Sequence, residues 1–146
     1  MIKRSIVIFT LTALLTYLLV SCWGSREIQM SEFVGTYVFR YPSGEVEVLF
    51  ISSDSTYRKD IYATYDDYKH KSTPKYSNEG RWSISKKNEL EFDGWLMYNK
   101  NRDPSFVLPV PSKSTMLNVG WRSASYGRKA VISVYEETGY VFEKTD

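Results

Sequence analysis

Histidine and cysteine are nearly absent from this sequence, with one of each in 146 residues. Zinc sites draw three or four ligands from Cys, His and carboxylates, and here only the carboxylates are plentiful. The same scarcity argues against a Ser–His or Cys–His nucleophile, and a lone cysteine forms no disulfide within the chain. We therefore expect a protein that is not an enzyme and that holds no metal and no cofactor.

A large excess of charge of one sign is also lacking, since 19 Lys and Arg residues face 17 Asp and Glu. The net charge of +2 provides no strongly basic face, so nucleic acid is not an expected partner. An aromatic content of 16%, made up of 12 Tyr, 7 Phe and 4 Trp, argues against a disordered chain. At this length there is room for one small domain.

The one long apolar run lies at the N-terminus. Lys3 and Arg4 precede a mostly apolar, uncharged segment over residues 5–20, and a small residue comes just before Cys22. A basic start, a short apolar segment and a small residue are typical of a secretory signal peptide. An uncleaved membrane anchor is the alternative, because the uncharged stretch 5–25 has 21 residues and a bilayer needs about 20.

The end of this run carries a known pattern. Leu19-Val20-Ser21-Cys22 resembles the lipobox of bacterial lipoproteins, with Leu at −3, a small residue at −1 and the chain's only cysteine at +1. The resemblance implies that the thiol of Cys22 takes a diacylglycerol, that the signal is cut before it, and that the new amine is often acylated. Each buried methylene of an acyl chain adds about 0.8 kcal/mol, so two or more chains give stable membrane attachment.

The resemblance also bears on location. In enterobacterial lipoproteins an Asp after the cysteine resembles an inner-membrane retention signal, and Trp23 stands there instead. No acidic run follows of the kind that resembles a surface-export signal. In a Gram-negative host we therefore expect the periplasmic face of the outer membrane. The expected organisation is a signal over 1–21, a lipidated cysteine and tether over 22–30, and a β domain over 31–146.

Apolar and polar residues alternate from Phe33 onward, which is typical of half-buried strands. Turn residues interrupt the pattern every 8–12 residues, and about eight to nine short strands result. In the second strand Val46, Val48 and Phe50 form the apolar side, while Glu45 and Glu47 form the polar side. The pattern predicts an all-β antiparallel meander that closes as a β-barrel or a curved sandwich.

Two other segments depart from this pattern. A short helical turn is expected over residues 31–34, before the first strand, and the polar stretch 66–78 is expected to form a long hairpin tip. Gly35-Thr36-Tyr37 then resembles the Gly-x-Trp that opens the first strand of lipocalin-like barrels, with Tyr in place of Trp. In that superfamily a late Arg or Lys packs over the Trp, and the resemblance implies this position for Lys144.

The candidates for chemistry are few. His70 lies between two lysines in a polar segment and is expected to be a solvated residue. Asp66-Asp67 and Glu136-Glu137 are adjacent pairs at expected turns, and adjacent strand residues point to opposite faces. A glycosidase needs two acids that face one another across a cleft, so these pairs do not support an envelope hydrolase.

Tyrosines and basic residues interleave between residues 57 and 76. Large aromatic side chains with a polar end, together with arginine, are enriched at binding surfaces. This segment is therefore a candidate partner-binding surface, although tyrosine also simply suits a half-exposed strand. The candidate residues are Tyr57, Tyr62, Tyr65, Tyr68 and Tyr76.

Tryptophans are the second group of candidates. Trp82, Trp95 and Trp121, with Arg122 beside the last, are placed to face the inside of a small barrel. They either line an open lumen that binds a small apolar ligand or fill that lumen completely. The sequence thus predicts a lipid-anchored, lipocalin-like binding protein of the cell envelope for a small apolar ligand or an envelope partner. The alternative is an inhibitor or immunity-type protein that binds another protein through the hairpin 57–76.

Overall fold

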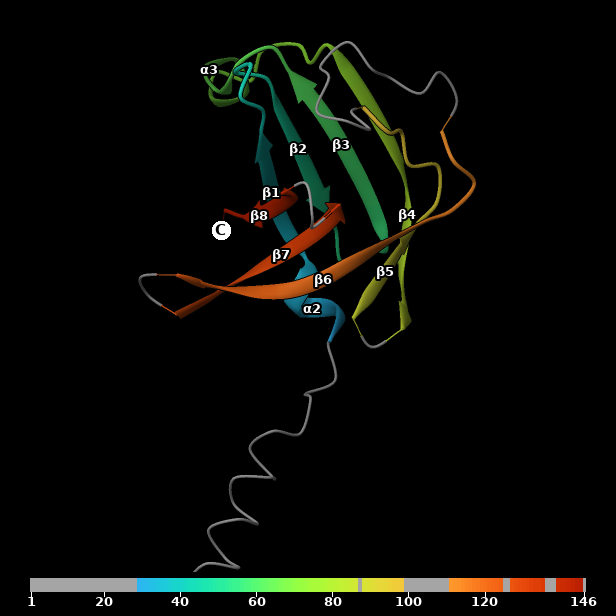
Figure 1. Cartoon of the computed structure of the whole chain (residues 1–146). Coiled ribbons are helices and arrows are strands. Elements are labelled where there is room, and N and C mark those ends of the chain that lie inside the picture. The colour runs from blue at the N-terminus through green and yellow to red at the C-terminus, as the bar shows by residue number, and fades with distance from the viewer. Residues whose placement is uncertain (1–28, 87, 99–110, 125–126, 136–138, 146) are drawn as a thin grey trace, which may run out of the picture.

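Alternating strands make up nearly all of the part of the chain that the structure, a computed structural model, describes: residues 29–86, 88–98, 111–124, 127–135 and 139–145. Eight strands pair in chain order, and the last returns to the first to close a barrel, so the predicted all-β barrel is confirmed (Figure 1). The elements are α2 (Met30–Phe33), β1 (Gly35–Arg40), β2 (Val46–Ile51), β3 (Thr56–Tyr62), α3 (Tyr65–Lys69), β4 (Tyr76–Lys86), β5 (Glu89–Phe92), β6 (Thr115–Ala124), β7 (Gly127–Tyr135) and β8 (Tyr140–Lys144).

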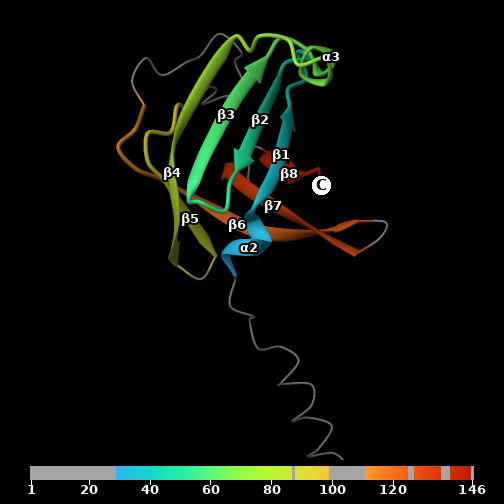
Figure 2. The same ribbon diagram turned by 180° about the vertical axis from the view of Figure 1, so that it is seen from behind.

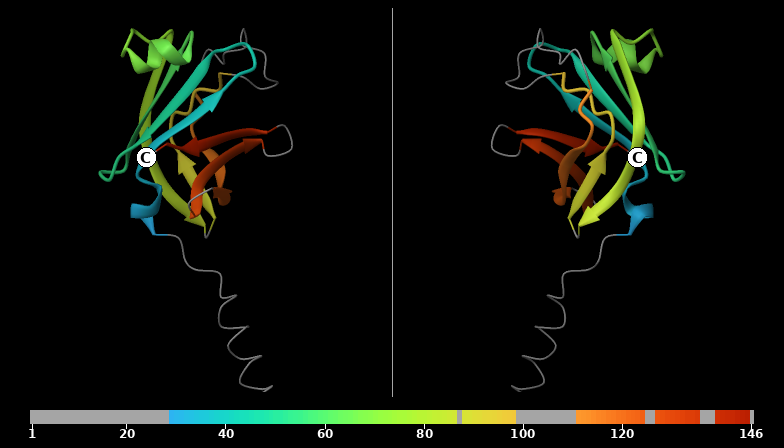
Figure 3. Two further views of the ribbon diagram at one scale, coloured as in Figure 1. Left: turned by 90° about the vertical axis from the view of Figure 1, so that its left-hand side faces the viewer. Right: turned by 90° about the vertical axis from the view of Figure 1, so that its right-hand side faces the viewer.

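The two short helices lie at opposite ends of the barrel. Helix α2 enters β1 at one end, while α3 connects β3 to β4 at the other (Figures 1 and 2). Side views show the same separation of the two helices (Figure 3). None of the described helices is long and apolar enough to cross a membrane.

Aromatic side chains fill the barrel interior. Tyr37, Phe39 and Tyr41 face inward together, as their alternation predicts. Their rings contact others from distant strands, and the ring centroids of Phe39 and Tyr140 lie 4.7 Å apart. The bulkiest of the fully buried aromatic side chains are Trp95, Tyr37, Tyr98, Tyr140, Phe33, Phe92 and Phe142. Packing between these rings, rather than a disulfide, holds the described barrel together.

Strand β2 is turned the other way from the prediction. Its Leu49 and Ile51 pack in the interior cluster, and the buried Glu47 points inward with them. Val46 and Val48 are equally buried, but they belong to a second cluster on the outer face of the sheet. The physical reason is that both faces of this strand are covered, so the apolar residues do not identify the interior side.

The outer cluster is covered by α3. Tyr65 and Tyr68 of this helix pack over Val46 and Val48, together with Tyr62 at the end of β3. The polar stretch 66–78 is therefore not a simple hairpin tip, since it begins within a helical turn and β4 starts at Tyr76. The predicted helical turn over 31–34 is present one residue earlier, as α2.

The residues that resemble the lipocalin-like opening lie together at the α2 end. Tyr37 is buried and its hydroxyl donates to the carbonyl of Phe33 at 3.2 Å. Lys144 pairs with Tyr37 in the register of β8 with β1, and its ammonium donates to the carbonyl of Val34 at 2.6 Å. Lys144 thereby ties the last strand to the segment that precedes the first.

Candidate functional site

The surface over α3 combines aromatic and basic side chains around a hollow of about 780 Å³. Residues from β2, β3, α3 and β4, together with the chain between α3 and β4, line it. We call this hollow and its rim the α3 surface. Its aromatic and basic members are Phe50, Arg58, Tyr62, Tyr65, Tyr68, Lys69 and Lys71.

Helix α3 is short, and its first turn is fixed by capping. Thr64 is the N-cap: its hydroxyl oxygen accepts from the backbone N–H of Asp67 at 3.1 Å and donates to the carboxylate of Asp67 at 2.7 Å. Asp66 and Asp67 in the first turn also favour the positive end of the helix dipole. The cap therefore holds Tyr65 and Tyr68 on the side that faces the sheet.

Cations stack on the rings of the α3 surface. The ring centroids of Tyr65 and Tyr68 lie 5.7 Å apart. The guanidinium of Arg40 lies 3.8 Å from the centre of the Tyr65 ring, and the ammonium of Lys69 lies 4.9 Å from the same ring. Such contacts contribute about 0.5–1 kcal/mol at exposed sites, so they hold the basic side chains against the aromatic surface.

A buried carboxylate lies in the wall of the hollow. Asp60 accepts from the hydroxyl of Ser77 at 2.6 Å and from the hydroxyl of Tyr62 at 3.3 Å, and it pairs with Arg58 at 3.1 Å. Burial and the neighbouring Asp60 raise the pKa of Tyr62, which keeps its phenol protonated. This acid is fully engaged, so the exposed charge of the hollow comes mainly from its cations.

A second polar group lies inside the barrel. Glu47 is 0% exposed and Lys59 is 1% exposed, and the Lys59 ammonium lies 3.1 Å from the Glu47 carboxylate. The hydroxyls of Tyr140, at 2.6 Å, and of Tyr41 donate to the same carboxylate. Lys59 also donates to the carbonyl of Leu96. Each charge is therefore satisfied by neighbours, as buried charges require.

Burial shifts the protonation of this group. It raises the pKa of both Tyr41 and Tyr140, and the negative charge of Glu47 raises them further. Burial lowers the pKa of Lys59, and Glu47 opposes that effect. The phenols remain protonated donors throughout the physiological range.

Glu45 is buried just before β2, two residues from Glu47 and nearer the α3 end. Its carboxylate accepts from the Tyr98 hydroxyl and the Lys75 ammonium, each at 2.6 Å. Burial alone raises the pKa of Glu45, but the hydrogen bonds from Lys75 and Tyr98 outweigh it and hold the pKa below its usual value. The interior thus holds two acids that are each bound by tyrosine and lysine.

Sequence reasoning missed this interior group because it assigned Glu45 and Glu47 to the solvent side of β2. Their partners come from distant positions, and Tyr140 is 93 residues from Glu47. The available signal was a lysine at an interior position of β3, since Tyr57, Lys59 and Ile61 share one face. A lysine in that register calls for an acid on the neighbouring strand.

The four residues proposed to line a lumen are not brought together. Trp82 and Trp95 are buried in the interior cluster, where the Trp95 ring packs 5.1 Å from Phe92. Trp121 is 45% exposed and contacts Phe33 of α2 at 6.1 Å. Arg122 is on the outer face and pairs with Glu143.

The five candidate tyrosines also divide. Tyr62, Tyr65 and Tyr68 meet at the α3 surface. Tyr57 instead lies in the interior, where its hydroxyl donates to the carbonyl of Asp93 at 3.0 Å. Tyr76 is 42% exposed and packs on Tyr98 at 5.8 Å, away from the lining of the hollow.

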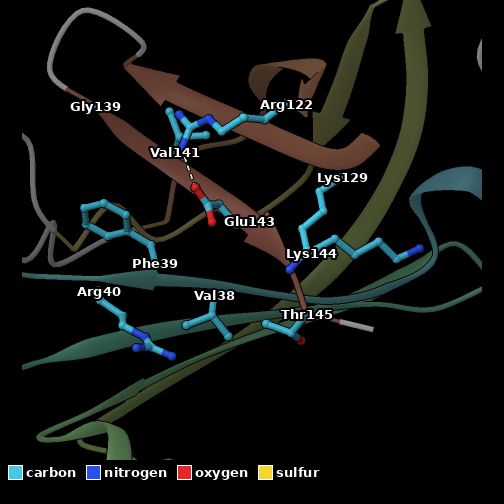
Figure 4. A pocket seen from close by; sticks show the side chains of 10 residues that line it. All are labelled: Val38, Phe39, Arg40, Arg122, Lys129, Gly139, Val141, Glu143, Lys144 and Thr145. Carbon is cyan, nitrogen blue, oxygen red and sulfur yellow. Dashed lines mark hydrogen bonds and ion pairs between the residues drawn. The ribbon is translucent and has the colours of Figure 1, made fainter. Parts of the chain in front are cut away.

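A separate hollow of about 460 Å³ lies on the outer face where β1 and β8 diverge (Figure 4). Arg40, Arg122 and Lys129 lie around it, with Glu143 beside Arg122. Arg40 connects the two hollows, because it lines this one and its guanidinium stacks on Tyr65 of the α3 surface.

The remaining candidates are quickly placed. His70 is exposed at the end of α3, and its Nδ1 lies 2.8 Å from the carbonyl of Asp66. Within the described ranges no three His, Cys, Asp or Glu side chains gather as a metal site would require. Cys22, the lipobox and the pair Glu136-Glu137 lie outside the described residues.

No family model, no curated protein and no solved structure matches this chain.

Proposed function

We propose that this chain is a lipid-anchored protein of the cell envelope that binds a partner protein through the α3 surface and catalyses no reaction. The observation that carries the proposal is the group of half-buried rings of Tyr65 and Tyr68 with the exposed cations Arg58, Lys69 and Lys71 around one hollow. Aromatic rings beside cations provide large contact area with few rotatable bonds, which is typical of the centres of protein interfaces.

The interior supports a scaffold role for the barrel. Large aromatic side chains occupy it, and the acids Glu45 and Glu47 already have phenol and lysine partners. A small apolar ligand would have to displace these rings, at a cost of several kcal/mol for each large buried side chain. Binding at the α3 surface needs no such rearrangement.

The positions of the two ends fit an anchored protein. The anchor proposed at Cys22 precedes α2, and α3 lies at the far end of the barrel (Figure 1). With α2 next to the membrane, the α3 surface points into the periplasm. A partner is then reached without contact with the bilayer.

The test is capture of partners from envelope extracts with matched variants of the full chain. Wild type is compared with Tyr65→Ala/Tyr68→Ala, which removes two rings, and with Lys69→Glu/Lys71→Glu, which reverses charge but leaves the packing of the outer cluster intact. Met116→Ala serves as the control because it removes an exposed apolar side chain elsewhere. We expect both double variants to lose the partner and the control to keep it.

Two outcomes would contradict the proposal. Identical partner sets for wild type and the folded charge-reversal variant would exclude the α3 surface. Native mass spectrometry that finds an apolar ligand of constant mass on the purified protein would instead favour a ligand inside the barrel. Folding of each variant is checked by its denaturant midpoint.

A further inference from the structure

Strands β1 and β8 pair over only part of their length, so the barrel is open along the rest of this seam. Strand β1 pairs with β2 along six residues, Gly35–Arg40, but with β8 only at Tyr37 and Val38. A hydrogen bond from the Thr145 N–H to the Thr36 carbonyl, at 2.9 Å, lies at the closed end. Figure 4 shows β8 diverging from β1 toward Gly139.

This divergence leaves backbone groups facing the opening. Alternate residues of an antiparallel strand direct their N–H and C=O to the same neighbour. The Tyr41 N–H donates toward β2, to Glu45 at 2.9 Å, so the peptide groups of Arg40 point to the other side, toward β8. The Thr145 N–H donates toward β1, to Thr36. Val141 lies four residues earlier on the same side of the strand, so its N–H and C=O also point toward β1. Arg40 and Val141 have no pairing with each other among the described strands.

Charge around the opening is one-sided. Four basic residues, Arg40, Arg122, Lys129 and Lys144, line it against one acid. The Lys144 ammonium is turned to the carbonyls of Glu32 and Val34, so Arg40, Arg122 and Lys129 supply the positive charge at the opening. That acid, Glu143, is already paired with Arg122. The excess positive charge disfavours a second copy of this edge and favours an acidic chain.

The opening does not lead into the barrel. The ring of Phe39 packs against Tyr140 at 4.7 Å and against Phe142 at 6.1 Å, so aromatic side chains close the gap beneath it. A bound group therefore stays at the level of the strands. Space, free backbone groups and charge thus meet at one place on the surface.

We propose that the opening between β1 and β8 binds a short, extended, acidic segment of another polypeptide, which adds as a strand. Its backbone pairs with the N–H and C=O groups of Arg40 and Val141, while its carboxylates meet Lys129 and Arg122. Strand addition of this kind takes affinity from main-chain hydrogen bonds and specificity from side chains. The proposal uses a different hollow from the α3 surface, with Arg40 as the residue that touches both, and it does not depend on a partner at α3.

The test uses the full mature chain in detergent micelles and defined peptides. The probe is acetyl-Glu-Val-Glu-Val-Glu-amide. One control peptide replaces Glu by Lys, and the other carries N-methyl groups that prevent backbone pairing. Amide hydrogen exchange followed by NMR reports on Arg40 and Val141 directly. We expect the acidic peptide to slow exchange at both amides by at least about tenfold at saturation, and the two controls to leave it unchanged.

Charge reversal tests the same site from the side of the protein. Lys129→Glu should lower the affinity for the acidic peptide by about three- to tenfold. Lys113→Glu changes an exposed lysine away from the opening and should leave that affinity unchanged. Unchanged exchange at Arg40 and Val141 would overturn the proposal. So would equal protection by the lysine peptide, or protection that appears only at α3.

Discussion

Lys59 and Glu47 form a buried charged pair inside a barrel whose other interior side chains are largely aromatic. Taking two charges out of water costs several kcal/mol for each ion, and the pair offsets this only because its other contacts are also made. Tyr41 and Tyr140 bind the carboxylate, and the ammonium lies 4.2 Å from the centre of the Trp95 ring. Each buried charge is therefore tolerated only while its partners are present.

Removing one partner should expose that dependence. We expect Lys59→Met to destabilise the protein by about 3–5 kcal/mol, because it leaves the Glu47 charge buried without a cation. Adding Glu47→Gln should recover part of the loss, since the amide oxygen still accepts from Tyr140 and carries no charge. Urea denaturation of the two variants measures the difference. A Lys59→Met variant as stable as wild type would show that the ion pair contributes nothing to the free energy of unfolding.

Gly80 lies where β4 passes close to another segment. A Cβ at this position would lie 2.2 Å from the carbonyl oxygen of Asp93 and 2.8 Å from Cε1 of Tyr57. Gly80→Ala should therefore destabilise the fold by about 1–3 kcal/mol through overpacking against backbone. Gly120→Ala is the matched control, because its Cβ meets Val131 at an ordinary 3.7 Å. Equal denaturant midpoints for the two variants would contradict this assignment.

Tyrosine burial predicts the response to high pH. Tyr41, Tyr98 and Tyr140 have pKa values above the ordinary 10.0, chiefly because of burial and then because of Glu45 or Glu47. Above pH 10 the unfolded chain loses these protons and the folded chain keeps them, so stability falls as the pH rises. Each tyrosine contributes about 1.4 kcal/mol per pH unit to this loss.

The variant Tyr140→Phe isolates one of these contributions. Between pH 10 and 11, its stability should fall less than that of wild type by about 1 kcal/mol, because the unfolded tyrosine is only half ionised at pH 10. Denaturant midpoints measured across this range, with phenolate absorbance as an independent record of ionisation, provide the comparison. Parallel curves for the two proteins would mean that Tyr140 titrates normally in the folded state.

Among the elements, β2 shows where sequence patterns stop being informative. The alternation Glu45-Val46-Glu47-Val48 correctly indicates a strand, but hydrophobicity assigns its faces the wrong way round. The outer face is covered by α3, and the interior face finds Lys59 and Tyr140, neither of which is a local neighbour. Only the partners decide which side of such a strand is interior.

Helix α3 begins with a local sequence signal. Thr64-Tyr65-Asp66-Asp67 has the hydroxyl and the acid three residues later that are typical of a helix start, and Thr64 is indeed the N-cap. Three of the five candidate tyrosines lie together, because α3 follows directly on β3: Tyr62 ends the strand, and Tyr65 and Tyr68 are in the helix. Tyr57 separates from them because strand alternation turns it inward. The resemblance implied that Lys144 packs over Tyr37. Lys144 is the register partner of Tyr37, and its ammonium donates to the carbonyl of Val34, a contact that the resemblance did not specify.

For the whole molecule, the central prediction concerns Cys22. If the lipobox is used, the protein purified from bacterial membranes lacks residues 1–21 and carries the mass of its acyl chains. Cys22→Ala should abolish both the cleavage and the added mass, and intact-mass spectrometry measures both. A wild-type protein without a lipid-sized increment would exclude lipid anchoring and would favour the uncleaved anchor or a soluble form.

The proposed anchor at Cys22 would also fix which end of the barrel lies near the bilayer. Met30 is eight residues beyond Cys22, a reach of at most about 28 Å at 3.5 Å per residue. The proposed anchor would therefore hold the α2 end close to the membrane, with α3 at the opposite end of the barrel (Figure 1). In that arrangement a partner would reach Tyr65 and Tyr68 without contact with the bilayer.

Energy transfer measures this orientation directly. An acylated Cys22 leaves no free thiol, so Ser31→Cys within α2 and Ser72→Cys just after α3 each create one exposed labelling site on the mature protein. With the protein in vesicles that carry an acceptor dye on the lipid headgroups, the label at residue 31 should transfer more efficiently than the label at residue 72. Because both substitutions are nearly isosteric, the difference reports position rather than folding. Equal transfer would mean that the barrel lies on its side, and stronger transfer from residue 72 would place the α3 surface against the membrane, where it could not bind a periplasmic protein.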